Sequence, residues 1–281
     1  MNDPVLFDIQ RGSTVDGPGF RTVVFFKGCN LRCGWCHNPE SQSFLPQLLV
    51  NEALCTHCGL CRQVCTHPSA CICCGSCQIY CPQRARRLCG TPWKLAQVME
   101  KILEDRNFYG KTGGGVTFSG GECMLQPESL QKLLQACRAE GIHTAVDTAG
   151  HVPWESFEKI LPDTDLFLYD IKAMDSRVHK QHTGVDNTLI LDNLEKLLAA
   201  GKNVILRLPL VAGVNDQARQ LLALLRWLQD RGRPEKIELL PCHSMGSGKY
   251  RSLGMDPPDF RPPSLERQKE LEEILKQEGF A

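Results

Sequence analysis

Cysteine is concentrated in one short stretch of this chain. Of the 16 cysteines in 281 residues, ten lie between residues 55 and 89: Cys55, Cys58, Cys61, Cys65, Cys71, Cys73, Cys74, Cys77, Cys81 and Cys89. The stretch contains few large aliphatic residues, so apolar burial alone cannot hold it together. We therefore interpret it as a small insert that is organised by what its thiols bind.

The insert repeats one cysteine spacing twice. Each tetrad follows C-x2-C-x2-C-x3-C, and Pro82 follows the second one, as in bacterial two-cluster ferredoxins. We expect two [4Fe-4S] clusters here, with the last cysteine of each tetrad binding the other cluster. A zinc ribbon, with its paired C-x2-C motifs, does not account for this spacing. The expected ligand sets are Cys55, Cys58 and Cys61 with Cys81, and Cys71, Cys74 and Cys77 with Cys65, which leaves Cys73 and Cys89 over.

Three further cysteines precede the insert. Cys29, Cys33 and Cys36 have C-x3-C-x2-C spacing and directly follow the first predicted strand. Three thiolates on a four-iron cluster leave one iron with an open position, which a catalytic metal needs for its substrate. The alternative is a zinc ion with His37 as its fourth ligand, or three unrelated cysteines. The position at a strand end favours the cluster.

Charge and hydropathy restrict the partners. Lys plus Arg and Asp plus Glu both number 32, so no net charge attracts nucleic acid or an anionic membrane. The mean hydropathy is −0.24. No apolar run approaches about 18 residues, and the first residues do not resemble an export signal. We expect a cytoplasmic protein that binds neither membrane nor nucleic acid, in a compartment where thiols serve as ligands.

Outside the insert, short apolar runs rich in β-formers alternate with segments of helical period. This alternation predicts an α/β fold with a parallel sheet, curled into a full or partial barrel. Active groups are then expected at the carboxyl ends of the strands. The predicted strands cover 20–28, 116–120, 142–148, 165–172, 203–211 and 236–242, and the helices cover 93–108, 129–141, 154–161, 187–201, 216–232 and 264–279.

One predicted strand ends in a glycine pair and a carboxylate. The segment GGGVTFSGGE places Gly120, Gly121 and Glu122 at the end of the strand that begins near residue 116. Alone this is weak evidence, because glycines also serve simply to permit a tight turn. Backbone opened by two glycines beside a carboxylate suits an α-ammonium group held close to the sheet edge.

Taken in order, five segments closely resemble the glycyl radical enzyme-activating enzymes of the radical S-adenosylmethionine superfamily. They are VDGPGFRTVVFFKGCNLRCGWCHNPES, GGGVTFSGGE, VDTAG, LYDIK and LLPCHSMG. The resemblance implies a partial (β/α)6 barrel over 1–50 and 90–281, and a ferredoxin-like domain over 51–89. It also implies an oxidoreductase that cleaves S-adenosylmethionine to a 5′-deoxyadenosyl radical, which takes hydrogen from a glycine of a partner enzyme.

The same resemblance assigns residues. Cys29, Cys33 and Cys36 match the cluster ligands, and Cys36, His37 and Asn38 match the segment that lines the adenine. The methionine-amino contacts match Gly120, Gly121 and Glu122. A monovalent cation site matches Asp147, with Thr148, and Asp170. Other polar contacts to S-adenosylmethionine match Lys172 and His243, the loop near the partner's glycine matches Asp16 and Gly17, and Cys123 replaces the proline that is usual after the glutamate.

Several alternatives remain open on the residues alone. Aspartates at strand ends, such as Asp147 and Asp170, also cap helices and turns. Lys172 fits a solvated loop and a lone His243 fits a structural role. We expect flavodoxin or ferredoxin as the electron donor of the activating enzyme. The competing functions are a radical S-adenosylmethionine enzyme acting on another peptide or a small molecule, and an iron-sulfur electron carrier.

Overall fold

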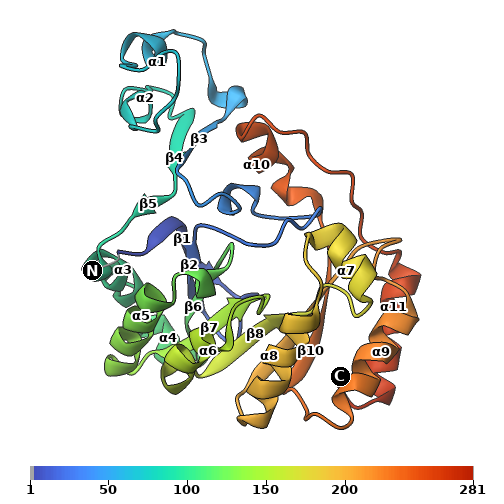
Figure 1. Ribbon diagram of the computed structural model, residues 1–281. Helices are drawn as coiled ribbons and strands as arrows, with labels where there is room; N and C mark the ends of the chain where they lie inside the picture. The colour runs from blue at the N-terminus through green and yellow to red at the C-terminus, as the bar shows by residue number, and fades with distance from the viewer. Residues whose placement is uncertain (1–2, 281) are drawn as a thin grey trace.

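The computed structural model describes residues 3–280, which contain an eight-stranded sheet (Figure 1). Six neighbouring strands run parallel in the order β10-β9-β8-β7-β6-β2, and β1 and β5 extend the sheet antiparallel. Within the described residues the edge strands β5 and β10 do not pair, so the sheet is a partial barrel. The strands are β1 (Val5–Ser13), β2 (Arg21–Phe26), β5 (Thr91–Pro92), β6 (Gly115–Gly120), β7 (His143–Thr148), β8 (Leu166–Asp170), β9 (Val204–Leu210) and β10 (Lys236–Pro241).

All six predicted strands are confirmed, and they are parallel. Sequence reasoning missed β1. This strand pairs with β2, with Leu6 opposite Phe26 and Ile9 opposite Val24. Its second half is polar and exposed, so it does not have the continuous apolar run of a buried parallel strand. The short β5 pairs with the start of β1 and was missed as well.

Helices cover the outer face of the sheet (Figure 1). The predicted helix over 93–108 is two helices, because buried Asp105 accepts hydrogen bonds from the Thr22 hydroxyl (2.7 Å) and the Arg11 Nε (2.9 Å) at the break. None of the helices in residues 3–280 is long and apolar enough to cross a membrane. The main helices are α3 (Leu95–Leu103), α4 (Arg106–Thr112), α5 (Pro127–Ala139), α6 (Trp154–Ile160), α8 (Thr188–Ala199), α9 (Ala218–Leu228) and α11 (Leu265–Gln277), and the sequence did not predict α7 (Ser176–Thr183) or α10 (Ser247–Ser252).

Alternate residues of each strand face opposite sides of the sheet. One set, including Phe118, Val146 and Phe167, packs against the helices in the main apolar core. The other set faces the concave side, where a small apolar cluster around Leu168 gives way to polar groups. The polar residues on this side include Ser119, Asp147, Asp170, Arg207 and Glu238. The fold therefore gathers charged side chains at one end of an otherwise apolar barrel.

The cysteine-rich insert stands at one end of the molecule, away from the helical layer (Figure 1). Its base is a two-stranded sheet in which β3 (Gln47–Val50) pairs antiparallel with β4 (Arg86–Cys89). Buried Lys27, just after β2, anchors this base by donating to the Gln47 side chain (3.0 Å) and to the Glu40 carbonyl (2.6 Å). The buried thiol of Cys89 donates to the same Glu40 carbonyl at 3.6 Å. Cys89 thus packs at the base of the insert.

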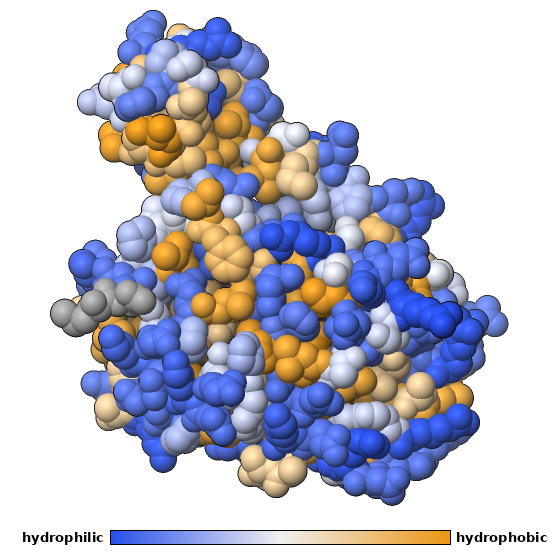
Figure 2. Space-filling view, viewed as in Figure 1, coloured by the Kyte–Doolittle hydropathy of each residue, from blue (hydrophilic) through white to orange (hydrophobic). Residues whose placement is uncertain are grey.

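Two short helices form the tip of the insert. They are α1 (Leu60–Gln63) and α2 (Ser76–Ile79), and each follows a left-handed glycine, Gly59 with φ +79° and Gly75 with φ +83°. The sequence offset between the two halves is constant, so the tetrads form an internal structural repeat. Figure 2 shows apolar side chains gathered on this part of the surface. The exposed apolar residues of the insert are Leu54, Leu60, Ile72, Ile79 and Tyr80.

Candidate functional site

The C-x3-C-x2-C cysteines lie in the loop that follows β2, at the carboxyl end of the strand. Backbone hydrogen bonds fix this loop against α7, from Arg32 N–H to the Thr183 carbonyl (2.7 Å) and from Gly34 N–H to the His182 carbonyl (2.9 Å). Desolvation raises the pKa of Cys29 to about 12 and that of Cys33 to about 11. These thiols therefore stay protonated until a bound metal displaces the proton.

The spacing of these sulfurs argues against a single zinc ion. Thiolates bound to zinc at about 2.3 Å in tetrahedral geometry have their sulfurs about 3.8 Å apart. Cys29, Cys33, Cys36 and His37 do not form a group whose ligand atoms all lie within 4.8 Å of one another, in the part of the chain that the structure describes. The ring of His37 lies instead against that of His243, with centroids 4.2 Å apart. These four side chains therefore do not form a zinc site within the described residues.

A partly buried ammonium group lies beside the thiols. Lys172 follows β8, and its Nζ lies 2.7 Å from an Asp170 carboxylate oxygen. Burial favours the neutral amine, but Asp170 and the sulfurs of Cys33 and Cys29 together raise the pKa of Lys172. In return, Lys172 opposes the effect of burial on the pKa of Cys33. The structure thus brings Lys172 and Asp170 beside the cysteine loop.

Glu122 is a further ionisable residue near the cysteine loop, and it is 1% exposed. Its carboxylate accepts hydrogen bonds from the Thr148 hydroxyl (2.7 Å), Ala149 N–H (3.0 Å) and Met124 N–H (3.2 Å). Burial raises the pKa of Glu122 to about 7 despite these donors. Thr148 therefore orients Glu122.

Two glycines bring Glu122 close to the cysteine loop. Gly120 has φ +126°, and a Cβ there would collide with the Phe26 carbonyl oxygen. A Cβ on Gly121 would collide with the Gly28 carbonyl oxygen, next to the first cysteine. The glycines are therefore required by the close approach of β6 to the end of β2.

We expect Gly120→Ala to lower the free energy of unfolding by about 3 kcal/mol or more, because it combines a left-handed backbone with a backbone collision. Gly141→Ala is the matched control, since Gly141 has φ +66° with open space around it. That substitution should cost only about 1 to 2 kcal/mol. Anaerobic urea unfolding followed by circular dichroism compares the two. Equal losses would contradict the close approach.

On the concave face, Arg207 joins three acidic side chains. Its Nη1 lies 3.8 Å from Asp147 and 3.9 Å from Asp16, and its Nε lies 3.4 Å from Glu238. Asp147 also accepts a hydrogen bond from the Ser119 hydroxyl at 2.6 Å. Burial raises the pKa of Asp147 to about 6 although Arg207 opposes the shift. Arg207 thus ties the loop of Asp16 and Gly17 to the strand ends.

A C-terminal segment closes over the end of the cysteine loop. In α10, the Tyr250 hydroxyl donates to the Cys36 carbonyl (3.0 Å), and Lys249 pairs with buried Glu40 (3.0 Å). Lys249 also donates to the side chain of Asn38. The exposed His243 has a ring contact with His37 and lines a small pocket with Cys36 and His37. The fold therefore brings His243 next to Cys36 and His37, from which it is distant in sequence.

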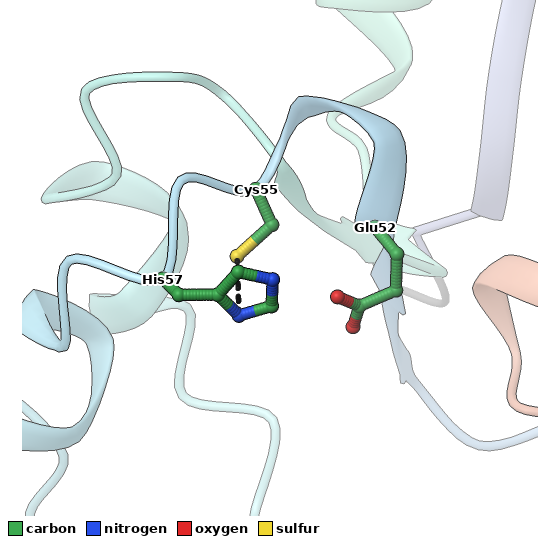
Figure 3. A group of neighbouring side chains, drawn as sticks. All are labelled: Glu52, Cys55 and His57. Atoms are coloured by element: carbon green, nitrogen blue, oxygen red, sulfur yellow. Dashed lines mark hydrogen bonds between the residues drawn. The ribbon is translucent and has the colours of Figure 1, made fainter.

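The insert cysteines surround two separate cavities. One, of about 240 Å³, is lined by Cys55, Cys58, Cys61 and Cys81. A smaller one is lined by Cys65, Cys71, Cys74 and Cys77, together with Cys73. Figure 3 shows that His57 and Glu52 also approach Cys55, and the ligand atoms of these three residues lie within 4.8 Å of one another. Each cavity thus has four thiols at the positions that the ferredoxin spacing pairs.

Cys123 and Cys137 lie in the apolar core, apart from these groups. Cys123 starts a short 3-10 helix (Cys123–Leu125), is fully buried, and donates from its thiol to the Phe118 carbonyl at 3.4 Å. Cys137 is buried in α5 with its Sγ 3.8 Å from the sulfur of Met99. Both cysteines fill the core. The replacement of the usual proline by Cys123 leaves the turn after Glu122 well packed.

Comparison with known proteins identifies the family. The model of the radical SAM superfamily matches residues 68–225. A choline trimethylamine-lyase activating enzyme from Oleidesulfovibrio alaskensis is 43% identical, over 93% of this chain and 90% of its own length. This chain belongs to the radical SAM superfamily. Within the superfamily it is a glycyl radical enzyme-activating enzyme, and therefore an oxidoreductase.

Other relatives agree with this assignment. A trans-4-hydroxy-L-proline dehydratase activating enzyme from Clostridioides difficile is 36% identical over 99% of this chain and 98% of its own length. A crystallised domain of pyruvate-formate lyase-activating enzyme from Bacteroides vulgatus is 35% identical, with a TM-score of 0.52. The match covers 59% of this chain and 96% of the crystallised domain. The partial barrel is therefore the radical SAM fold.

Radical SAM membership implies a [4Fe-4S] cluster and S-adenosylmethionine. The residues present in the activating enzyme fit both groups. Three desolvated thiols in one loop supply the thiolate ligands that a cluster needs. Buried Glu122 and the partly buried Lys172, of opposite charge, fit the amino and carboxylate groups of an amino acid. Arg207, Lys249 and Tyr250 are the site residues that sequence reasoning missed.

Proposed function

We propose that Cys29, Cys33 and Cys36 hold the catalytic cluster of this activating enzyme and leave one iron open for S-adenosylmethionine. The observation that carries the proposal is the convergence of three desolvated thiols with Lys172 at the carboxyl ends of β2 and β8. When bound, the cluster supplies the electron that cleaves S-adenosylmethionine, and the 5′-deoxyadenosyl radical takes hydrogen from a glycine of the partner. Anaerobically reconstituted protein reduced with dithionite should form 5′-deoxyadenosine.

The charged groups of the site position S-adenosylmethionine. The close approach at Gly120 and Gly121 places Glu122, which accepts hydrogen bonds from the methionine amino group. Lys172 forms an ion pair with the methionine carboxylate. The carboxylates of Asp147 and Asp170 repel each other, which raises the pKa of Asp147 further. This repulsion supports a monovalent cation between them. The adenine lies along Cys36, His37 and Asn38, with His243 beside them.

Binding of S-adenosylmethionine should strengthen as pH rises through about 7. Burial raises the pKa of Glu122 to about 7, so the carboxylate is protonated below that pH and accepts fewer hydrogen bonds. The ionised fraction changes by about tenfold between pH 6 and pH 8, and we expect the dissociation constant to fall by about the same factor. Anaerobic calorimetry measures it. The Glu122→Gln variant should lose this dependence, and an unchanged dependence in that variant would contradict the role of Glu122.

We propose that residues 51–89 form a domain that binds two auxiliary [4Fe-4S] clusters. The ligands are Cys55, Cys58, Cys61 and Cys81 for one cluster and Cys65, Cys71, Cys74 and Cys77 for the other. The support is the agreement between the ferredoxin spacing and the two cysteine-lined cavities. Iron and sulfide analysis should then give about twelve of each per chain. Zinc without sulfide would exclude the clusters.

The insert also offers a docking surface for an electron donor. Exposed Ile79 (77%) and Tyr80 (61%) lie at the end of α2, close in sequence to the exposed Arg84. An apolar patch beside cationic side chains suits a small acidic redox protein, so we propose flavodoxin or ferredoxin as the donor. Reduced thiols in such number also favour a cytoplasmic location.

At the opposite, barrel side, Asp16 and Gly17 contact the glycine loop of the partner enzyme, and Arg207 positions these two residues.

A further inference from the structure

The two halves of the insert carry a fifth ligand-type side chain at the same place. His57 stands two residues after the first cysteine of the first tetrad, and Cys73 stands at the same position in the second. Both have a left-handed backbone, with φ of +54° and +55°. These values are uncommon for residues other than glycine. The repeat therefore holds both side chains in one unusual orientation.

That orientation directs each side chain to the first cysteine of its tetrad. The Nδ1 of His57 lies 3.9 Å from the Cys55 Sγ (Figure 3). In the second half, the Sγ of Cys73 lies 4.0 Å from the Cys71 Sγ. Imidazole and thiolate are both iron ligands in proteins. Each half thus places a potential metal ligand next to a cysteine that the ferredoxin spacing already assigns.

Cys73 is the stronger of the two cases. It lines the same cavity as Cys65, Cys71, Cys74 and Cys77, so five thiols surround a site for four. Cys71 is exposed, whereas Cys73 is half-buried and its thiol donates to the Pro46 carbonyl at 3.3 Å. The more accessible ligand therefore has a better protected thiol directly beside it.

We propose that Cys73 is a reserve ligand, which binds the second auxiliary cluster when Cys71 is lost. The inference rests on the proposed function, because it requires that cluster. In the exchange, the iron–sulfur bond to Cys71 is absent or breaks, the Cys73 thiol releases its proton to solvent, and its thiolate forms a new bond to the same iron. One thiolate replaces another, so no electron is transferred and the cluster charge is unchanged.

The test compares iron content and thiol protection in anaerobically reconstituted full-length protein. We expect about twelve iron per chain in both the wild type and Cys71→Ala, and about eight in Cys71→Ala/Cys73→Ala. Iodoacetamide labelling with peptide mass spectrometry should find Cys73 alkylated in the wild type and protected in Cys71→Ala. Cys77→Ala is the matched control. In the described residues, the sulfur of Cys73 has a contact at 4.0 Å to that of Cys71 and no such contact to that of Cys77, so this variant should also hold about eight iron.

The outcomes separate the reserve ligand from the proposed clusters. About eight iron in Cys71→Ala, with about twelve in the wild type, would overturn the reserve role while keeping the auxiliary clusters. About four iron in the wild type would instead remove the clusters and the inference with them. If Cys71→Ala is insoluble, Cys71→Ser carries the same test: protection of Cys73 from alkylation supports the proposal, and full alkylation overturns it.

Discussion

Cys33→Ala is expected to abolish cleavage of S-adenosylmethionine, with a loss of at least about a thousandfold in 5′-deoxyadenosine formation. Cys33 is the central cysteine of the C-x3-C-x2-C motif, and both Lys172 and Cys36 shift the pKa of its thiol. Without it, two thiolates remain for a cluster that needs three, so the open iron site is not formed. Chromatography of the reaction after dithionite reduction measures the product.

Cys137→Ala is the matched control for this experiment. Cys137 is equally a free cysteine, but it is buried in α5 with a sulfur contact to Met99. Its replacement should leave cleavage within about twofold of the wild type, since alanine is favourable in a helix and the change removes one small core atom. Substantial cleavage by Cys33→Ala would contradict the assignment of the catalytic cluster.

Cys58→Ala is expected to separate the two routes of reduction. Cys58 lines the first cavity of the insert, far in sequence from the catalytic loop. Its loss should remove one auxiliary cluster and leave about eight iron per chain. Cleavage with dithionite should remain within about threefold of the wild type, whereas cleavage with reduced flavodoxin should fall by at least about tenfold, because we expect the insert to pass electrons from the donor to the catalytic cluster.

Two control measurements are needed for this interpretation. The variant must keep the spectrum of the S-adenosylmethionine-bound catalytic cluster, and its circular dichroism must match that of the wild type. Equal losses with dithionite and with flavodoxin, in a variant that meets both conditions, would show that the insert is not an electron relay. Cys33→Ala provides the contrast, because it should lose both activities.

The parallel sheet could be predicted because its strands are short segments rich in β-forming residues that alternate with segments of helical period. The antiparallel β1 could not, since its second half is polar, and its pairing with β2 is a long-range contact of the folded chain. The break between α3 and α4 was also hidden. It depends on Asp105 meeting Thr22 and Arg11, which are distant in sequence.

The site residues also divide into those that a local sequence pattern predicts and those that long-range contacts bring in. Cysteine spacing predicted two ligand sets, and the members of each set line one cavity of the insert, because ligand spacing encodes a local geometry. The spacing gave no place to Cys73, which lines the second cavity as well. Arg207 was missed although a charged residue inside the apolar run NVILRLPLV was a usable signal. Lys249 and Tyr250 carried no such signal, since their contacts with Asn38 and Cys36 exist only when the C-terminal segment folds back over the cysteine loop.

The most direct measurement is electron paramagnetic resonance of a partner enzyme after activation. The reconstituted protein is incubated anaerobically with S-adenosylmethionine, dithionite and the glycyl radical enzyme encoded nearest to it. An activating enzyme should produce a glycine-centred doublet in the partner, and Cys33→Ala should produce none. Cleavage of S-adenosylmethionine without a doublet in any neighbouring glycyl radical enzyme would contradict this function and favour a radical enzyme that acts on another peptide or on a small molecule.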